Sequence, residues 1–270
     1  MEFMSEDDMK ISVLASGSTG NVTYIETPQH KMLVDAGLSG KKIEALMNSI
    51  GRDLSDVDAL FLTHEHTDHI KGAGVLARRY NLDLYANQGT WNAITPKIGP
   101  IPEAQKNIFE VGKTKSFGDL DVESFAVSHD AAEPQFYEFH HNGKSFVILT
   151  DTGYVSERVE GQIENADAYL FEVNHDVEML RMGSYPWPLK QRILSDHGHL
   201  SNEAGANALM DVMGYNTKKI FLGHLSLHNN MKELAHLTVA SMMKNKDLGV
   251  GHDFQLLDTD HAVASKLTVI

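Results

Sequence analysis

The stretch His64-Glu65-His66-Thr67-Asp68-His69 decides how the rest of this sequence is interpreted. It carries three histidines and an aspartate, the side-chain types that bind transition-metal ions through nitrogen and oxygen. The apolar run Ala59–Leu62 precedes it and predicts a buried strand, and residues 70–79 follow it and predict a helix. We therefore expect the hexapeptide at the carboxyl end of a strand, where open α/β sheets bind their ligands.

The spacing inside the hexapeptide indicates two metal positions. Residues two apart in an extended segment point the same way, so His64 and His66 are placed to reach one ion. Where the chain turns into the helix, Asp68 and His69 point to another side and are placed to hold a second ion. The alternative is a polar loop whose histidines only cap the helix. That alternative would crowd four ligand side chains at a strand end with no ion to offset their desolvation.

Length and composition favour one large α/β domain. We predict that residues 10–270 form this domain and that the acidic residues 1–9, which lack the apolar core of a signal peptide, are a disordered lead-in. No apolar run approaches the ~18 residues of a membrane span, so no membrane partner is expected. The sequence has no cysteine. This excludes disulfides, thiolate zinc sites and a cysteine nucleophile, and it fits a reducing cytoplasm.

The formal net charge of −14 favours solubility and argues mildly against broad nonspecific binding to nucleic acid. It does not exclude a nucleic-acid substrate, because bound divalent ions reverse the field at a site. The aromatic loop Tyr185-Pro186-Trp187-Pro188, predicted as a kink, has three interpretations: a platform for a terminal base, a lid, or a packing element.

A second pattern, an apolar strand that ends in His or Asp, recurs in three places. His129 follows residues 125–128, Asp151 follows residues 146–150, and His224 follows residues 220–223. A single such residue is usually part of a loop, but three of them in a chain that holds the hexapeptide predict further metal ligands. Asp151 suits a bridging position because a carboxylate has two oxygens to share between ions.

Three other segments bear on the site and its surroundings. Asp35, after the strand expected at 31–34, either holds a ligand histidine in place or caps a helix near 39–50. Residues 16–21, Ser-Gly-Ser-Thr-Gly-Asn, lack the Lys-Ser/Thr ending of a nucleotide-binding loop, so a tight turn at the edge of the site is favoured over direct ligand binding. Residues 96–106 contain three prolines and are predicted to be a loop.

The order His-x-His-x-Asp-His, followed by His, Asp and His at later strand ends, resembles the metallo-β-lactamase superfamily over essentially the whole chain. The resemblance implies an α/β fold, a four-layer αβ/βα sandwich, with two divalent ions, Zn²⁺ or Mn²⁺. By position, it implies that one ion is held by His64, His66 and His129. It implies that the other is held by Asp68, His69 and His224, and that Asp151 bridges the two.

Within that superfamily, several stretches resemble the YycJ/WalJ-type metallo-hydrolases, a subgroup similar to ribonuclease Z and the phosphodiesterase branch. They are residues 14–18 with 20–21, residues 128–134, residues 198–202, and residues 223–226 with 229–230. The implied activity is that of a DNA exonuclease acting 5′ to 3′ on duplex ends. The interval between Asp151 and His224 is too short for the inserted clamp domain of the β-CASP nucleases.

Gly198-His199 resembles the glycine-histidine near the active site of ribonuclease Z, where a histidine assists the leaving group together with an acidic partner. The resemblance implies that His199 donates a proton or contacts the phosphate and that Glu172, at the end of a buried strand, is the partner. The alternative is that both residues cap helices or are solvated. Asp68 completes the set of catalytic candidates, as a metal ligand rather than a free base.

These parts predict phosphodiester hydrolysis. A pair of metals would supply a hydroxide nucleophile near neutral pH to attack phosphorus, and the leaving alkoxide would need the proton that His199 offers. A small-molecule phosphodiesterase, acting on a cyclic or nucleotide phosphodiester, is the nearest alternative. A non-catalytic regulatory protein that retains its metals is the alternative of a different class, and it is weakened because every expected ligand is present. A β-lactamase is disfavoured.

Overall fold

The computed structural model describes residues 7–270, which form two compact units. Unit 1 contains the chain up to Ala126 together with Ala131–Lys144 and Asp260–Ile270, and unit 2 contains Val127–Asp130 and Ser145–Thr259. The lead-in predicted over residues 1–9 falls mainly on residues 1–6, outside the described part. Met9 is buried, and its carbonyl oxygen accepts a hydrogen bond from the backbone N–H of Ile270 at 3.0 Å.

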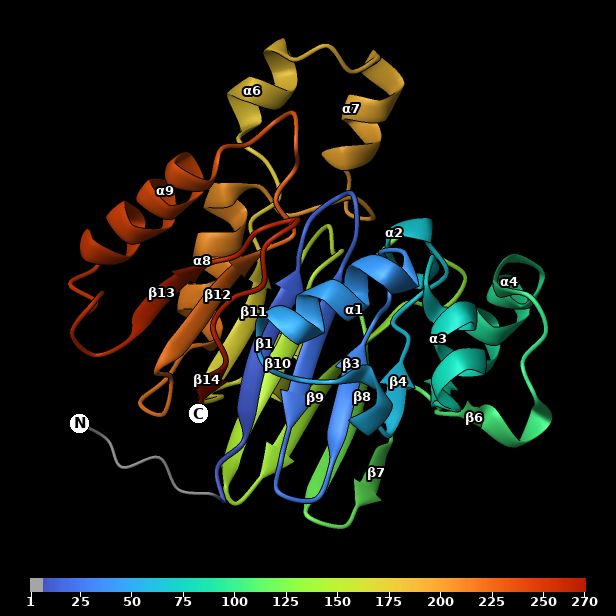
Figure 1. The fold of residues 1–270 in the computed structure, drawn as a ribbon. Coiled ribbons are helices and arrows are strands. Elements are labelled where there is room, and N and C mark those ends of the chain that lie inside the picture. Colours follow the sequence, from blue (N-terminus) through green and yellow to red (C-terminus); the bar gives the residue numbers. More distant parts are fainter. Residues whose placement is uncertain (1–6) are drawn as a thin grey trace. The chain divides into compact units, whose positions relative to one another are not determined.

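A seven-stranded mixed sheet forms the centre of unit 1 (Figure 1). Its strands run in the order β14-β1-β2-β3-β4-β5-β6, antiparallel from β14 to β3 and parallel from β3 to β6. Their bounds are β1 Lys10–Ala15, β2 Val22–Glu26, β3 Lys31–Val34, β4 Ala59–Phe61, β5 Asp83–Ala86, β6 Lys106–Ile108 and β14 Thr268–Val269. The register pairs Val34 with Phe61, so the carboxyl ends of β3 and β4 lie side by side.

Helices cover this sheet through one apolar stripe each. Helix α1 (Gly40–Ser49) buries Ile43 and Met47 and contacts β1 and α3 (Ala73–Tyr80). Helix α3 in turn contacts α4 (Gln88–Ile98) (Figure 1). The antiparallel strands β7 (Thr114–Phe117), β8 (Leu120–Ala126) and β9 (Gln135–His141) complete unit 1. Asn142 and Gly143, which follow β9, both have positive φ, as a primed turn requires.

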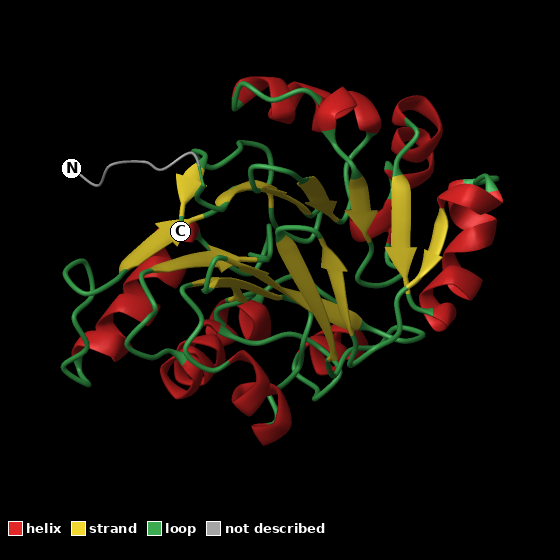
Figure 2. Ribbon diagram, turned by 90° about the horizontal axis from the view of Figure 1, so that it is seen from below, coloured by secondary structure: helices red, strands yellow, loops and turns green. Residues whose placement is uncertain are grey.

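Unit 2 is built on a parallel sheet in the order β10-β11-β12-β13. The strand bounds are β10 Lys144–Leu149, β11 Ala168–Glu172, β12 Lys219–Gly223 and β13 Gln255–Asp258. Helix α8 (Asn202–Val212) contacts β11, α5 (Glu157–Ile163) and α9 (Lys232–Lys244), and α9 contacts β13 (Figure 1). In Figure 2, helices lie alongside the strands. The register pairs Glu172 with Gly223, so loops after β10, β11 and β12 leave from one edge of the sheet.

The structure corrects three local predictions. The helix expected over 70–79 is divided into α2 (Thr67–Ile70) and α3, and at the break a Cβ on Gly72 would lie 2.4 Å from the carbonyl oxygen of Leu38. The loop expected over 96–106 is wrong at both ends: α4 continues through Pro96 to Ile98, where Gly99 at φ 75° ends it, and β6 begins at Lys106.

The kink expected at residues 185–188 is instead the start of helix α7 (Trp187–Ile193). Pro186 occupies the N-cap position and Pro188 lies in the first turn, where a missing N–H costs no helical hydrogen bond. Helix α6 (Val177–Met182) precedes it.

None of the helices in the described part of the chain has the length and apolar character needed to cross a bilayer.

Candidate metal centre

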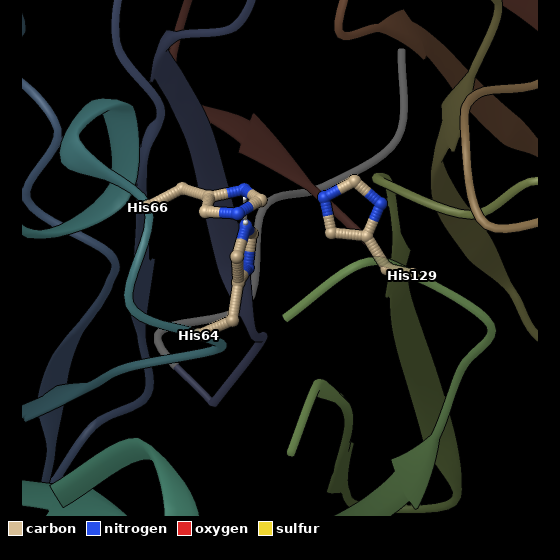
Figure 3. A group of neighbouring side chains, drawn as sticks. All are labelled: His64, His66 and His129. Atoms are coloured by element: carbon tan, nitrogen blue, oxygen red, sulfur yellow. Dashed lines mark hydrogen bonds between the residues drawn. The ribbon is translucent and has the colours of Figure 1, made fainter. Parts of the chain in front are cut away.

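The hexapeptide leaves the carboxyl end of β4, as its sequence predicts. His64 is buried, and His66 is the N-cap residue of α2. The Nε2 atom of His64 lies 3.1 Å from Nδ1 of His66, and Figure 3 shows the two rings turned toward each other. Asp68 and His69 lie on α2, with His69 Nε2 3.6 Å from Asp68 Oδ2 and the His69 ring 4.1 Å from the His64 ring. Unit 1 thus gathers its four predicted ligands in one place.

Asp35 holds His69 in position. Its carboxylate accepts hydrogen bonds from Nδ1 of His69 at 2.7 Å and from the backbone N–H and hydroxyl of Thr63 at 2.9 Å each. Burial raises the pKa of Asp35, against the opposing charge and hydrogen bonds of His69. With Nδ1 of His69 donating to Asp35, Nε2 is the nitrogen that is presented to an ion. Of the two roles open for Asp35, the structure supports that of orienting a histidine, His69, which is a predicted ligand.

The glycine-serine turn between β1 and β2 braces the hexapeptide through Asn21. The Asn21 side chain closes the turn on Gly17, accepting from its N–H at 2.9 Å and donating to its carbonyl oxygen at 3.1 Å. The backbone N–H of Asn21 donates to the carbonyl oxygen of Asp68 at 2.8 Å, and its side-chain nitrogen lies 3.1 Å from His69 Nε2. A Cβ on Gly37 would lie 1.6 Å from that same Asp68 oxygen, so this close approach requires glycine.

In unit 2 the three predicted strand-end ligands also lie together. Oδ1 of Asp151 is 3.3 Å from Nε2 of His224 and 3.8 Å from Nε2 of His129. Asp151 and His224 adopt left-handed backbone conformations, at φ 51° and 56°, and Asp35 in unit 1 does the same at 61°. Such residues are strained, and their occurrence at three strand ends is typical of a functional site.

Glu172 is fully buried at the end of β11 and joins two histidines. Its Oε1 accepts from Nδ1 of His199 and from Nδ1 of His224, each at 2.8 Å, and its Oε2 accepts from the backbone N–H of Thr152 at 2.9 Å. Burial alone would raise the pKa of Glu172, but the charge of His199 and the hydrogen bonds from both histidines outweigh it and lower that pKa.

Helix α8 is capped by Ser201, so the structure gives that capping role to neither His199 nor Glu172. His199 is partly exposed, and its ring centre lies 5.3 Å from that of His129. Glu172 and His199 are therefore brought together beside the strand-end ligands of unit 2.

A buried group of amides supports His224. The side chain of Asn174 donates to the carbonyl oxygen of His224 at 2.7 Å, which fixes the strained backbone there. Asn230 donates to the carbonyl oxygen of Asn174 at 3.0 Å and to Oδ1 of Asn202 at 2.8 Å. Sequence reasoning missed Asn21, Thr63 and Asn174 as supporting residues, because their roles depend on contacts with residues distant in the chain.

The donor set fits divalent transition-metal ions. His69, His129 and His224 share one arrangement, in which Nδ1 faces an oxygen: Asp35 Oδ2, the Gly198 carbonyl oxygen at 3.3 Å, and Glu172 Oε1, respectively. This arrangement favours the tautomer that leaves Nε2 available to a metal ion, the usual support for ligand histidines. Asp151, His199 and His224 offer ligand atoms that lie within 4.8 Å of one another, with Glu172 completing the group. Nitrogen and oxygen donors suit zinc and manganese alike.

Comparison with known proteins places the chain in a family. A family model described as the beta-lactamase superfamily domain matches residues 30–225. Exodeoxyribonuclease WalJ from Streptococcus pneumoniae is 60% identical over 269 residues, covering 99% of this chain and 100% of that protein. Exodeoxyribonuclease YycJ from Bacillus anthracis is 56% identical over 262 residues, covering 97% and 99%.

Solved structures agree on the fold. The metallo-β-lactamase fold protein YhfI from Bacillus subtilis matches with a TM-score of 0.70 at 15% identity, over 96% of this chain and 99% of that one. The α/β class and the αβ/βα sandwich predicted from the sequence are thereby confirmed. With the family model spanning most of the sequence and two relatives matching it from end to end, the chain belongs to the metallo-β-lactamase superfamily and, within it, to the WalJ/YycJ group.

Proposed function

We propose that this protein is a metal-dependent DNA exonuclease that hydrolyses phosphodiester bonds from 5′ to 3′ at duplex ends. The observation that carries the proposal is the 60% identity, over its full length, to a relative named an exodeoxyribonuclease. The geometry within each unit agrees with it, since each places histidines and carboxylates where a hydrolytic metal centre needs them. The lack of cysteine suits a reducing compartment, and we place the activity in the cytoplasm.

Two divalent ions, zinc or manganese, complete the proposed site. His64, His66 and His129 would hold one ion, Asp68, His69 and His224 the other, and Asp151 would bridge them. When bound, such a pair supplies a water of lowered pKa as the nucleophile and neutralises charge on the phosphate. The donor chemistry of each group of side chains supports the assignment, as does the hydrogen bond that orients each of His69, His129 and His224.

His199 and Glu172 form the proposed proton donor. The lowered pKa of Glu172 keeps it a carboxylate, so it holds the proton on Nδ1 of His199. The proton given to the leaving alkoxide therefore comes from Nε2 of a doubly protonated ring. When the His199 ring has given up this proton and is neutral, its hydrogen bond to Glu172 remains, so the ring keeps its orientation between turnovers. Asp68 acts as a ligand rather than as the base.

The test is a substrate panel on the manganese- or zinc-loaded protein: 5′-labelled and 3′-labelled duplex DNA, duplex RNA, and bis-p-nitrophenyl phosphate. We expect stepwise release of labelled mononucleotides from 5′ ends, abolished by Asp151→Asn and unaffected by Asp211→Asn on the exposed face of α8. Turnover of the small ester without any DNA degradation would replace the proposal with a small-molecule phosphodiesterase. Metal binding with neither activity would indicate a regulatory protein.

A further inference from the structure

The α6–α7 segment, residues 176–199, connects the strand that ends in Glu172 to His199, and its two helices are linked to each other. The ammonium group of Lys190 is buried and donates to the carbonyl oxygens of Arg181 at 2.7 Å and Gly183 at 2.6 Å, which ties α7 to the end of α6. Prolines at the N-cap and in the first turn of α7 restrict the backbone further. Figure 1 shows α6 and α7 standing apart from α8 and α9, the helices that contact the sheet of unit 2.

This segment contacts the loop that carries His129 and the loop that carries His224, both of them predicted ligands. Arg192 on α7 pairs with Asp130, the neighbour of His129. The hydroxyl of Ser128 donates to the carbonyl oxygen of Asp196 at 2.7 Å.

On the other side, the ring of Tyr185 packs edge-on against His228, 5.9 Å away, in the loop that follows His224. The N–H of Asp176 donates to the carbonyl oxygen of Asn229 at 2.9 Å in the same loop. The segment therefore borders the predicted centre within unit 2.

Large apolar side chains are exposed on this segment and in the loops that carry the predicted ligands. On the segment, Met182 is 86% exposed, Trp187 60% and Leu194 41%. Tyr154, three residues after Asp151, is 48% exposed, and Leu227, three residues after His224, is 49% exposed. A single exposed apolar residue needs no explanation. Here, however, the loops after β10, β11 and β12 each contain a predicted ligand or proton donor, and each also exposes a large apolar side chain.

The charges on the segment argue against phosphate as the group it binds. Arg181 forms an ion pair with Glu178 at 2.9 Å, Arg192 forms one with Asp130, and Lys190 donates its hydrogen bonds to backbone carbonyl oxygens. A surface that is apolar, partly aromatic and without uncommitted cations suits the flat faces of nucleobases rather than the sugar-phosphate chain.

We propose that the α6–α7 segment binds the unpaired bases at the DNA end under attack, with Trp187 stacking on one of them. The inference rests on the proposed exonuclease function. An exonuclease acting on a duplex must separate the terminal nucleotide from its neighbours, and an aromatic platform replaces part of the stacking that is lost. Ends with unpaired 5′ nucleotides should therefore be better substrates than blunt ends.

The first test is binding without catalysis. The chain has two tryptophans, and the other, Trp91, is buried. Tryptophan fluorescence of the chelator-treated protein should therefore fall when a single-stranded oligonucleotide is added, because a stacked base quenches Trp187. The fall should be absent in Trp187→Ala and retained in Tyr215→Ala, a control that removes a 90% exposed aromatic residue after α8.

The second test is kinetic and compares normal DNA with DNA whose terminal nucleotides are abasic. For the wild type, KM should rise roughly 5- to 150-fold on the abasic substrate, the range expected for loss of one stacked base. Trp187→Ala should show that rise on normal DNA and no further rise on abasic DNA, while Trp187→Phe restores part of the difference. Circular dichroism and thermal unfolding confirm that each variant is folded.

The outcomes separate the two claims. A wild-type protein that leaves DNA intact contradicts the proposed function itself. A wild-type protein that degrades DNA with the same KM on normal and abasic ends contradicts the stacking surface alone. If sedimentation shows that Trp187→Ala converts a dimer to a monomer without changing KM, the surface is an interface between copies of the chain and the proposal is wrong.

Discussion

At the scale of single residues, the site depends on the carboxylates that orient histidines. Glu172 uses one oxygen for two rings, one a predicted metal ligand and the other the predicted proton donor. Asp35 orients a single ring, that of His69, by accepting a hydrogen bond from its Nδ1. Because these two carboxylates are buried and bound on several sides, they fix ring positions that exposed side chains would leave variable.

Replacing His199 with alanine should separate proton donation from metal binding. On DNA, kcat should fall about 10²- to 10⁴-fold, the usual contribution of a positioned acid. On bis-p-nitrophenyl phosphate the fall should be much smaller, because p-nitrophenolate leaves without being protonated. Steady-state kinetics on both substrates, with metal content measured in parallel, make the comparison. Equal losses on the two substrates would show that His199 does something other than protonate the leaving group.

Asp35→Asn should weaken metal binding while leaving the chain folded. An amide in place of the carboxylate removes the charge that keeps Nδ1 of His69 protonated, and loss of such an outer partner costs about 10- to 100-fold in metal affinity. Competition with a chromophoric chelator measures the affinity, and Asp121→Asn, on the exposed face of β8, is the matched control. Unchanged affinity in Asp35→Asn would refute the orienting role.

The placement of the hexapeptide and of the three strand-end residues was predictable at the residue scale, because each combines a ligand-type side chain with a strand boundary. Asn21 and Thr63 were not, because an amide and a hydroxyl in loops give no local sign of their partners. The strained φ values of Asp35, Asp151 and His224 were also not predictable from the local sequence. At His224 the strained backbone is held by the side chain of Asn174, which follows another strand.

At the scale of elements, a polar cluster anchors β2 to the chain beyond α1. Glu26 at the end of β2 accepts from Arg52 at 2.7 Å, from the hydroxyl of Tyr24 at 2.7 Å, and lies 3.4 Å from Lys10 on β1. Burial would raise the pKa of Glu26, but the hydrogen bonds from Arg52 and Tyr24 outweigh it and lower that pKa from 4.5 to about 2.

This cluster should make stability depend on pH in a defined window. Because the folded pKa of Glu26 is depressed, its stabilisation is complete above pH 4.5 and is lost as pH falls toward 2. Glu26→Gln should therefore lower the free energy of unfolding by about 1–3 kcal/mol at pH 7, and the difference from wild type should shrink below pH 4.5. Urea unfolding at several pH values measures this, with exposed Glu103→Gln as control. A difference independent of pH would exclude the ionic origin.

Elements with a strong apolar pattern were predictable, and short or edge elements were not. Buried strands such as β4 and β12 and the Ser201-capped α8 follow directly from their sequences. Strand β14 has two residues and forms by pairing with β1 at the opposite end of the chain, so its local sequence does not predict a strand. The continuation of α4 through Pro96 shows that a proline near a helix end is tolerated when packing holds the preceding turns.

At the scale of the whole molecule, the predicted ligands come from segments spread over more than half of the sequence. The order of residue types, rather than any single motif, made the family recognisable, and the full-length relatives confirm it. Metal identity was not predictable, because the same nitrogen and oxygen donors suit several ions.

Removing the metals should reduce stability as well as activity. Ions that bind the native chain and not the unfolded one stabilise it by mass action, about 2.7 kcal/mol at a concentration 100 times the dissociation constant. Thermal unfolding of chelator-treated protein should therefore shift upward on adding Zn²⁺ or Mn²⁺, and Asp151→Asn should show a smaller shift. Equal midpoints with and without metal would argue against ions held by folded side chains.

The most direct test is an anomalous difference map from crystals of the manganese-loaded protein, measured at the manganese absorption edge. We expect two peaks per chain, one bound by His64, His66 and His129 and the other by Asp68, His69 and His224, with Asp151 contacting both. A map without peaks at these side chains, or with one peak bound by other residues, would contradict it.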